Sequence, residues 1–208
     1  HEITQDVMAG FLEDSAEMGV RGISLVSDGE STLSPAFAFS LRRGAELGMS
    51  MANGTNAILL TPDKAEAVLP YLTYLRINCS AGEPKRYAEI MGMPERMFRR
   101  MVDNVSHMVL FKREARLPVT LGLQMVLMPQ DADQILPFAR LGLDLGVDYA
   151  IIKHCSDDED GSLGVDYGKY AALTPLLRQA EALSTPQTQI VIKWNKIGVG
   201  NNRSYSRC

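Results

Sequence analysis

A carboxylate stands beside a glycine in the stretch 25–33, which reads LVSDGESTL. Gly29 permits the close approach of a ligand, and the Glu30 carboxylate can accept hydrogen bonds from an ammonium group or another donor. For an isolated Asp-Gly-Glu, the plainer interpretation is that the glutamate caps the following helix or is simply exposed. The elements on either side of this turn therefore decide what the carboxylate does.

Other residues that could bind a metal ion or take part in catalysis are scattered along the chain. Cys79, Cys155 and Cys208 are widely spaced and form no CxxC pair, which argues against a disulfide framework. His154 follows a predicted strand, but none of the histidines has the HxxxH or HExxH spacing of a helical zinc site. The acidic run 157–161 lacks the ligand spacing of a calcium loop, so we interpret it as a solvated loop. We expect no metal ligands among these residues.

The composition is that of a globular protein. The chain has 208 residues, of which 46% are hydrophobic and 22% are charged, and one large domain is the simplest interpretation. A net charge of -4 gives no electrostatic reason to expect a nucleic-acid partner. No apolar run approaches the roughly 20 residues that cross a bilayer. We therefore expect no membrane association and a cytoplasmic location.

Helices and strands alternate along the chain. Apolar periodicity, glycine stops and the pair Ser34-Pro35, interpreted as a helix N-cap, define the boundaries. Predicted strands cover 22–26, 49–52, 74–79, 119–128, 149–153 and 189–194, and predicted helices cover 2–18, 34–47, 62–69, 83–115 with a break at 92–94, 131–145 and 167–183. This alternation implies an α/β fold with a parallel sheet, either an open doubly wound sheet or a closed or partial barrel.

Polar residues gather after the predicted strands. In either architecture the carboxyl ends of the strands meet at one rim, where ligands bind. The segments at this rim are 27–30, 53–55, 78–82, 124 with 128–130, and 153–157. Loops are generally polar, so solvation accounts for part of this concentration.

Three ordered segments resemble a known family. SDGESTLSPAF, GMSMANGTNAILL and YLRINCSAGEPKRYAEIMG resemble the GGEP-type, TNG-type and RVSLDAG-like motifs of the radical S-adenosylmethionine (radical SAM) superfamily. The resemblance continues through LPVTLGLQMVLMPQDADQILPFARLGLDLGVDYAIIK and so covers most of the chain. It implies a partial TIM-like (βα)6 barrel over residues 1–197, followed by a tail, 198–208, that could begin an extension.

The resemblance also implies a cofactor site. Gly29 and Glu30 would hold the ammonium group of S-adenosylmethionine, although Asp28 replaces a frequent glycine and Ser31 a frequent proline. Arg76 is interpreted as a structural ion-pair or rim residue. The other expected cofactor-binding residues are Asn53 at the TNG-like turn, Asn78 and Ser80 toward the ribose hydroxyls or the methionine carboxylate, and Gln124 beside the adenine.

The implied activity needs an iron–sulfur cluster. In the intact protein, a reduced 4Fe-4S cluster would cleave S-adenosylmethionine to a 5′-deoxyadenosyl radical, which abstracts hydrogen from a small-molecule or peptide substrate; flavodoxin or ferredoxin would supply the electron. This chain has no CxxxCxxC segment, so we expect the first barrel strand and the cluster ligands upstream of His1 and the chain alone to be inactive.

Two alternatives from other classes stay open. The chain could be a cluster-free nucleoside-binding or structural module on the same barrel. It could also be an enzyme of an unrelated α/β barrel family that uses Lys153 or His154 as an acid or base.

Overall fold

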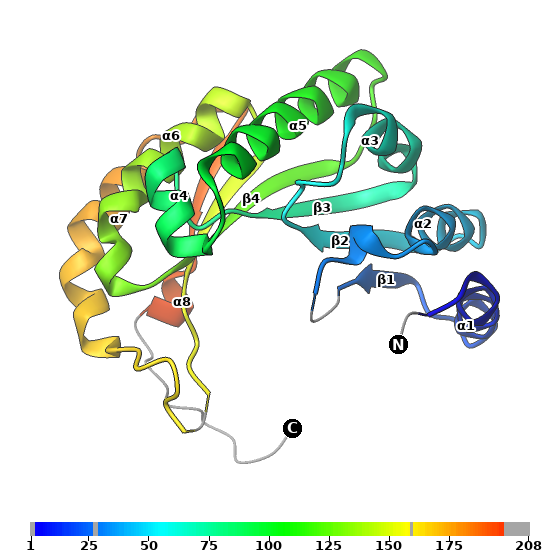
Figure 1. Ribbon diagram of the computed structural model, residues 1–208, viewed down its shortest axis with the longest axis horizontal. Helices are drawn as coiled ribbons and strands as arrows, with labels where there is room; N and C mark the ends of the chain where they lie inside the picture. The colour runs from blue at the N-terminus through cyan, green and yellow to red at the C-terminus, as the bar shows by residue number, and fades with distance from the viewer. Residues whose placement is uncertain (1–2, 27–28, 159, 198–208) are drawn as a thin grey trace. The chain divides into compact units, whose positions relative to one another are not determined.

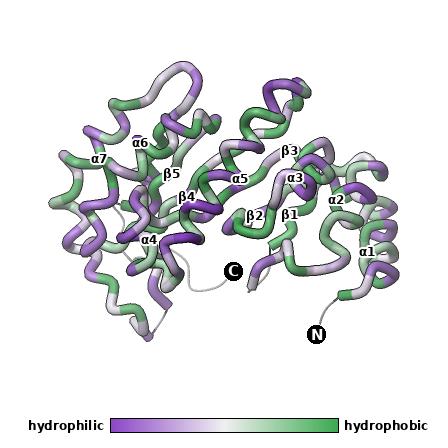
Figure 2. Tube along the Cα trace, turned by 45° about the horizontal axis from the view of Figure 1, so that its top comes forward, coloured by the Kyte–Doolittle hydropathy of each residue, from purple (hydrophilic) through white to green (hydrophobic). Residues whose placement is uncertain are grey.

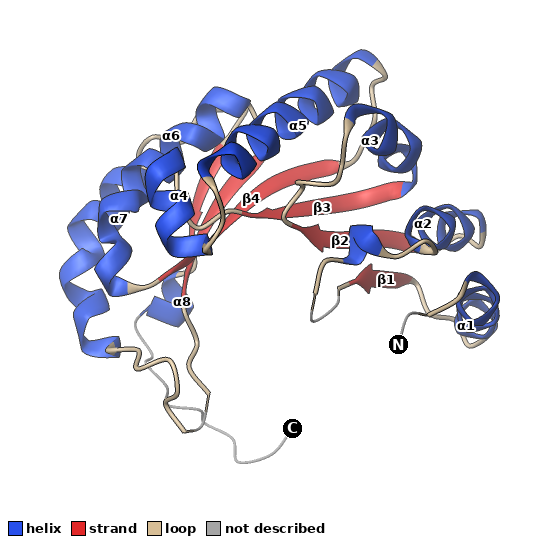
Figure 3. Ribbon diagram, viewed as in Figure 1, coloured by secondary structure: helices blue, strands red, loops and turns tan. Residues whose placement is uncertain are grey.

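The computed structural model describes residues 3–26, 29–158 and 160–197. Six parallel strands form one sheet in the order of the sequence, and helices connect them (Figures 1 and 3). The strands are β1 (Gly22–Leu25), β2 (Ser50–Thr55), β3 (Leu72–Asn78), β4 (Thr120–Leu127), β5 (Tyr149–His154) and β6 (Gln189–Ile192). The alternation predicted from the sequence, and with it the α/β class with a parallel sheet, is confirmed.

Helices and short 3-10 turns occupy the connections. The α-helices are α1 (Gln5–Glu17), α2 (Phe37–Glu46), α3 (Pro62–Val68), α4 (Pro84–Met91), α5 (Glu95–Glu114), α6 (Ile135–Leu145), α7 (Thr174–Glu181) and α8 (Trp194–Ile197). The 3-10 segments are η1 (Ser31–Leu33), η2 (Leu69–Tyr71), η3 (Pro129–Gln134) and η4 (Tyr167–Leu173). In the part of the chain that the structure describes, none of these helices is long and apolar enough to cross a bilayer.

The chain divides into two compact units, residues 1–78 with 99–122 and residues 79–98 with 123–208. Strand β4 begins in the first unit and continues in the second. The predicted domain of residues 1–197 stays a prediction, and the predicted tail, 198–208, lies outside the described residues.

In the first unit, α2 lies close against β2. Side chains of β2 are alternately buried and half-buried, and Met51 is fully buried. An ideal Cβ at Gly44 of α2 would lie 2.3 Å from the Met51 sulfur, so a glycine there lets the helix approach the strand. Helix α1 packs beside α2 (Figure 1), and α5 carries hydrophobic and hydrophilic residues in alternation, as an amphipathic helix does (Figure 2).

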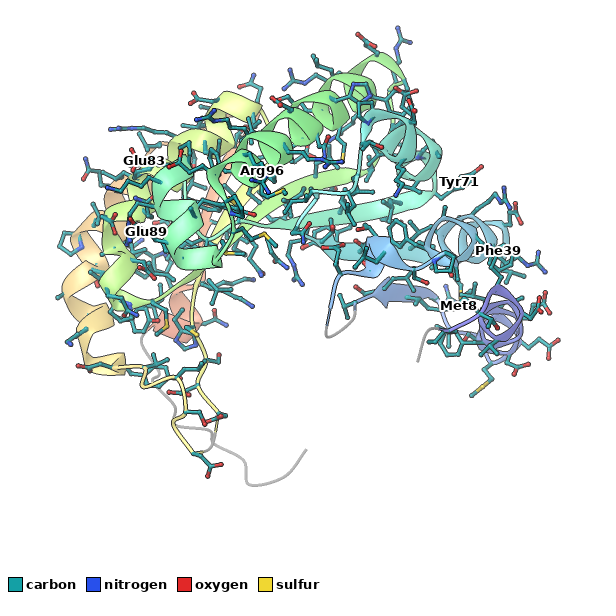
Figure 4. The ribbon with its side chains drawn as sticks, in the orientation of Figure 1. Met8, Phe39, Tyr71, Glu83, Glu89 and Arg96 are labelled. Atoms are coloured by element: carbon teal, nitrogen blue, oxygen red, sulfur yellow. The ribbon has the colours of Figure 1, made fainter. Side chains whose placement is uncertain are left out.

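In the second unit, α6 covers β5 in the same way. An ideal Cβ at Gly142 would lie 2.7 Å from the Ala150 side chain, and Gly146 ends the helix with a positive φ of 67°, as predicted. Arg86 of α4 donates hydrogen bonds to Glu89 on the same helix and to Asp133 of η3. Figure 4 shows Glu89 on α4 and Glu83 at the N-cap position just before it.

Three predicted boundaries were wrong. Strand β2 does not end at residue 52 but continues through Asn53–Thr55, because side-chain hydrogen bonds satisfy these polar residues inside the sheet. Ser34 is not the N-cap of α2; its hydroxyl accepts a hydrogen bond from the Ala36 amide in a turn, and the helix begins at Phe37. Strand β6 stops at Ile192, and Trp194 begins α8, so the predicted strand alternation of residues 193–195 does not occur.

Candidate functional site

The Glu30 carboxylate joins the loop after β1 to the end of β2. Its Oε1 accepts hydrogen bonds from the Thr55 hydroxyl at 2.6 Å, the Thr32 hydroxyl at 2.7 Å and the Thr32 amide at 3.2 Å. Its Oε2 accepts one from the Asn56 amide at 2.8 Å. Glu30 is thus the N-cap of η1, as the plainer interpretation held. Among the described residues Oε2 accepts this single hydrogen bond, and a carboxylate oxygen can accept two.

Asn53 holds the same loop from inside the strand. Its side-chain amide donates to the Leu25 carbonyl and to the Ser31 hydroxyl, both at 2.7 Å. Ser31 therefore has a structural role here. Asn53 is 1% exposed, and its Oδ1 is buried with no hydrogen-bond partner among the described residues. A buried acceptor without a partner is uncommon and marks a place where a donor can bind.

Loop residues beyond β2 are fixed by helix α5. The Asn104 side chain, 5% exposed, donates to the carbonyls of Ala57 and Ile58 at 2.8 and 3.2 Å. This fastens the segment that presents the Asn56 amide to Glu30. Sequence reasoning missed Asn104, whose signal was a single polar residue on the apolar face of a helix.

A cavity of about 400 Å³ opens next to Glu30, within the size range of ligand pockets. Gly29, Glu30 and Ser31 line one side, and the apolar wall includes Leu33 and Phe37. A carboxylate acceptor beside an apolar wall suits a ligand that presents a hydrogen-bond donor next to apolar surface. Asp28, which belongs to the same turn, lies outside the described residues.

The remaining predicted cofactor residues fall into both units. Asn78 is the last residue of β3 in the first unit and is half-buried. Ser80 and Gln124 lie together in the second unit, where the Ser80 hydroxyl accepts from the Val126 amide at 3.3 Å and the Gln124 carbonyl accepts from the Cys79 amide at 2.9 Å. Gly29, Glu30 and Asn53 are therefore brought together within one unit, and Ser80 and Gln124 within the other. The cofactor roles of all six residues stay predictions.

In the second unit, Asp157 organises the loop after β5. Its carboxylate accepts from the backbone amides of Asp158, Leu163 and Val165 at 2.9 to 3.0 Å. These amides, Val165 foremost, lower the pKa of Asp157 below its ordinary value. Asp157 is only 6% exposed, so the acidic run is not uniformly solvated: its first residue is a buried anchor.

Two tyrosines that the sequence analysis did not single out surround His154. The Tyr167 and Tyr170 rings lie with their centroids 5.6 and 5.7 Å from the His154 ring. The Tyr170 hydroxyl donates to the Leu127 carbonyl and accepts from the Cys155 amide, and burial raises the pKa of Tyr170 to about 12. These contacts fix the end of β5, and the acid–base role for Lys153 or His154 stays untested.

Of the two cysteines that the structure describes, Cys79 behaves as a small apolar residue. Cys79 is fully buried, its thiol donates to the Ala81 carbonyl, and burial raises its pKa to about 12. Cys155 is half-buried, and Cys208 lies outside the described residues. Within residues 3–26, 29–158 and 160–197, His, Cys, Asp and Glu side chains form no group of three or more that could hold a metal ion.

Comparison with known proteins identifies solved structures that share the fold of this chain. No protein-family model and no curated protein matches the chain. Solved structures do match, among them Streptococcus suis SuiB bound to S-adenosylmethionine (TM-score 0.71, 16% identity, 92% of this chain and 44% of SuiB), native anSMEcpe with bound AdoMet (0.68, 12%, 92% and 55%) and archaeal TYW1 (0.56, 15%, 85% and 60%).

These three proteins are radical SAM enzymes. At such low identity the likeness shows the fold alone: the chain has a partial TIM-like α/β barrel with a parallel sheet, as predicted, and shares this fold with the three enzymes. The chain spans 44%, 55% and 60% of the length of SuiB, anSMEcpe and TYW1, respectively.

Proposed function

We propose that this chain is the barrel core of a radical SAM enzyme and binds S-adenosylmethionine at the carboxyl ends of its strands. The observation that carries the proposal is the Glu30 carboxylate, which the Thr55 hydroxyl and the Asn56 amide hold at the edge of a cavity. The chain has the same fold as SuiB and anSMEcpe, and both of these proteins have been solved with S-adenosylmethionine bound.

Each predicted residue has a role in this proposal. Glu30 Oε2 accepts a hydrogen bond from the cofactor's ammonium group, and Gly29 leaves space for the close approach. Asn53 keeps the loop in place, and its free Oδ1 is available to a further donor. The second group of residues, Asn78, Ser80 and Gln124, would hold the ribose, the methionine carboxylate and the adenine.

With an electron from a reduced 4Fe-4S cluster, bound S-adenosylmethionine supplies a 5′-deoxyadenosyl radical that abstracts hydrogen from a substrate. The contribution of this chain is to bind and orient the cofactor and to exclude water behind the apolar wall of the cavity.

The cluster ligands are proposed to come from residues outside the given sequence. Cys79, Cys155 and Cys208 make no CxxxCxxC segment, and the Cys79 thiol is buried and resists ionisation. We therefore expect the 208-residue chain to bind cofactor without cleaving it. An external reductant such as flavodoxin or ferredoxin belongs to the same proposal.

A peptide is the favoured substrate class. SuiB has been solved bound to the precursor peptide SuiA, and anSMEcpe with a Kp18Cys peptide. Both structures share their fold with about nine-tenths of this chain.

Calorimetric titration of the chain with S-adenosylmethionine and with adenosine tests the proposal. Glu30→Gln keeps the shape of the side chain but removes its charge, so we expect about tenfold weaker binding of S-adenosylmethionine. Adenosine has no ammonium group, so its affinity should not change. Glu17→Gln, an exposed position on α1, is the matched control.

The titration also separates the alternatives. If S-adenosylmethionine does not bind the wild-type chain, the proposed function is wrong. If both ligands bind and Glu30→Gln alters neither affinity, the Glu30 assignment is wrong and a cluster-free nucleoside-binding module is the better interpretation.

A further inference from the structure

Ala57, in the turn that follows β2, has a backbone conformation that residues with a side chain rarely adopt. Its φ is 59°, in the left-handed region. This conformation brings Cβ close to a carbonyl oxygen, so it is costly for a residue other than glycine. Such residues persist only where the surrounding structure holds them, and they gather at ligand sites. The contacts that hold Ala57 therefore have a purpose beyond closing the turn.

Hydrogen bonds from two directions hold this turn. Within it, the Thr55 hydroxyl accepts from the Ala57 amide at 3.0 Å, and the Asn56 side chain accepts from the Ile58 amide at 2.9 Å. From helix α5, Asn104 Nδ2 donates to the carbonyls of Ala57 and Ile58 at 2.8 and 3.2 Å. Asn104 is thus the long-range partner that fixes the two peptide groups on either side of the turn.

A primary amide suits this position on α5. Its nitrogen carries two hydrogens, one for each carbonyl. Asn104 is only 5% exposed, and Met101, Val105 and Met108 on the same helix are fully buried. A polar side chain among such neighbours is costly unless its hydrogen bonds are made. The two carbonyls of the turn are what this amide serves.

The held turn sets the direction of the Asn56 amide. This amide donates to Glu30 Oε2 at 2.8 Å, and among the described residues it is the one hydrogen-bond donor to that oxygen. The other oxygen, Oε1, is held by the hydroxyls of Thr55 and Thr32. Fixing one oxygen leaves the plane of a carboxylate free to turn. The Asn56 amide, whose residue is joined directly to Ala57, fixes the second oxygen and with it the plane.

We propose that Asn104 is a positioning residue for the Glu30 carboxylate. By holding Ala57 in the left-handed conformation, it fixes the Asn56 amide and, through that amide, the oxygen assigned above to the ammonium group of a ligand. Asn104 is not among the residues that line the cavity beside Glu30, so it acts through the turn and not by contact with the ligand. The inference rests on the proposed function for the identity of that ligand.

The Asn56 amide proton reports this arrangement by NMR without any ligand. A proton donated to a charged carboxylate is strongly hydrogen-bonded and resonates downfield, so Glu30→Gln should move it upfield. We expect Asn104→Ala to move it in the same direction. A coupling between two sites acts both ways, so Glu30→Gln should also shift the Asn104 side-chain amide resonances. That measurement keeps Asn104 intact, so an unchanged resonance would overturn the proposal even if Asn104→Ala fails to fold.

Calorimetric titration measures the consequence for binding. Asn104→Ala should weaken binding of S-adenosylmethionine about fivefold and leave adenosine, which has no ammonium group, unchanged. Adding Ala57→Gly should restore part of the affinity, because glycine adopts the left-handed conformation readily. Met108→Ala, at a fully buried position one turn further along α5, is the control for general destabilisation. It should lower stability but leave the Asn56 resonance and both affinities as they are.

The two proposals fail in different ways. If Asn104→Ala leaves the Asn56 resonance unchanged, or if Met108→Ala changes it as much, the positioning role is wrong, even where S-adenosylmethionine binds normally. If S-adenosylmethionine does not bind the wild-type chain but Asn104→Ala and Glu30→Gln both move the Asn56 resonance upfield, the proposed function is wrong and the positioning role stands.

Discussion

The Thr55 hydroxyl donates a hydrogen bond of 2.6 Å to Glu30 Oε1, so the last residue of β2 is bonded to the loop that follows β1. The same hydroxyl accepts from the amide of Ala57 at 3.0 Å. One side chain therefore fixes two loops at the same edge of the sheet. The position of the Glu30 carboxylate depends on it.

Replacing Thr55 with valine should destabilise this edge. Valine keeps the shape but removes the hydroxyl, which leaves the buried Ala57 amide without its acceptor. We expect the free energy of unfolding to fall by about 1–3 kcal/mol in urea denaturation. Thr73→Val, at an exposed position of β3, is the control and should be nearly neutral. Equal stability of the two variants would show that the Thr55 contacts contribute nothing.

Asp157 should make stability depend on pH in the acid range. Its pKa is lowered in the folded state, so its contribution is fully present above the ordinary carboxyl pKa of about 4 and is lost as the pH falls through the folded value. Urea unfolding measured between pH 7 and pH 2 should show that the free energy of unfolding falls less steeply with decreasing pH in Asp157→Asn than in the wild type. Asp160→Asn, an exposed neighbour, should keep the wild-type profile.

Gly82 should tolerate no side chain. An alanine Cβ there would lie 2.1 Å from the backbone carbon of Pro137 and 2.4 Å from the amide nitrogen of Phe138. Since backbone must shift to relieve the overlap, we expect Gly82→Ala to cost about 3 kcal/mol of unfolding free energy. Gly10→Ala in α1 meets nothing within 4 Å and should instead stabilise the protein by about 0.5–1 kcal/mol. Both values can be read from chemical denaturation.

Thiol labelling should separate two cysteines. Cys79 is fully buried with its pKa raised to about 12, whereas Cys155 is half-buried. We expect iodoacetamide at pH 8 to modify Cys155 in the folded protein and Cys79 only after unfolding, as read by peptide mass spectrometry. Equal rates at the two sites would mean that the region around Cys79 opens readily.

Much of the fold could be predicted because local signals agree with the tertiary structure. Gly92 and Gly146 end α4 and α6 with positive φ, and apolar periodicity marks the helices between them. The end of β2 was missed because Asn-Gly-Thr is typical of a turn. Asn53 and Thr55 are acceptable inside a strand only because their side chains bond to residues far away in sequence.

The candidate site could be predicted in part. The turn at Gly29-Glu30 carries a local motif, so it was recognised. Two of the donors to Glu30, the Thr55 hydroxyl and the Asn56 amide, lie some 25 positions further on, and no spacing rule connects them to it. Tyr167 and Tyr170 were missed for the same reason, since their contacts with His154 form only when the loop closes around Asp157.

Side chains of β2 point alternately to the two faces of the sheet, so three consecutive residues allow each face to be altered independently. Asn53 and Thr55 point to the face that holds the Glu30 loop, and Gly54 points to the face that carries Arg76. Substitutions at position 54 should thus change the surface beside Arg76 while the loop keeps its conformation. Diversity at 53 or 55 would instead alter the loop, and with it every ligand that depends on Glu30.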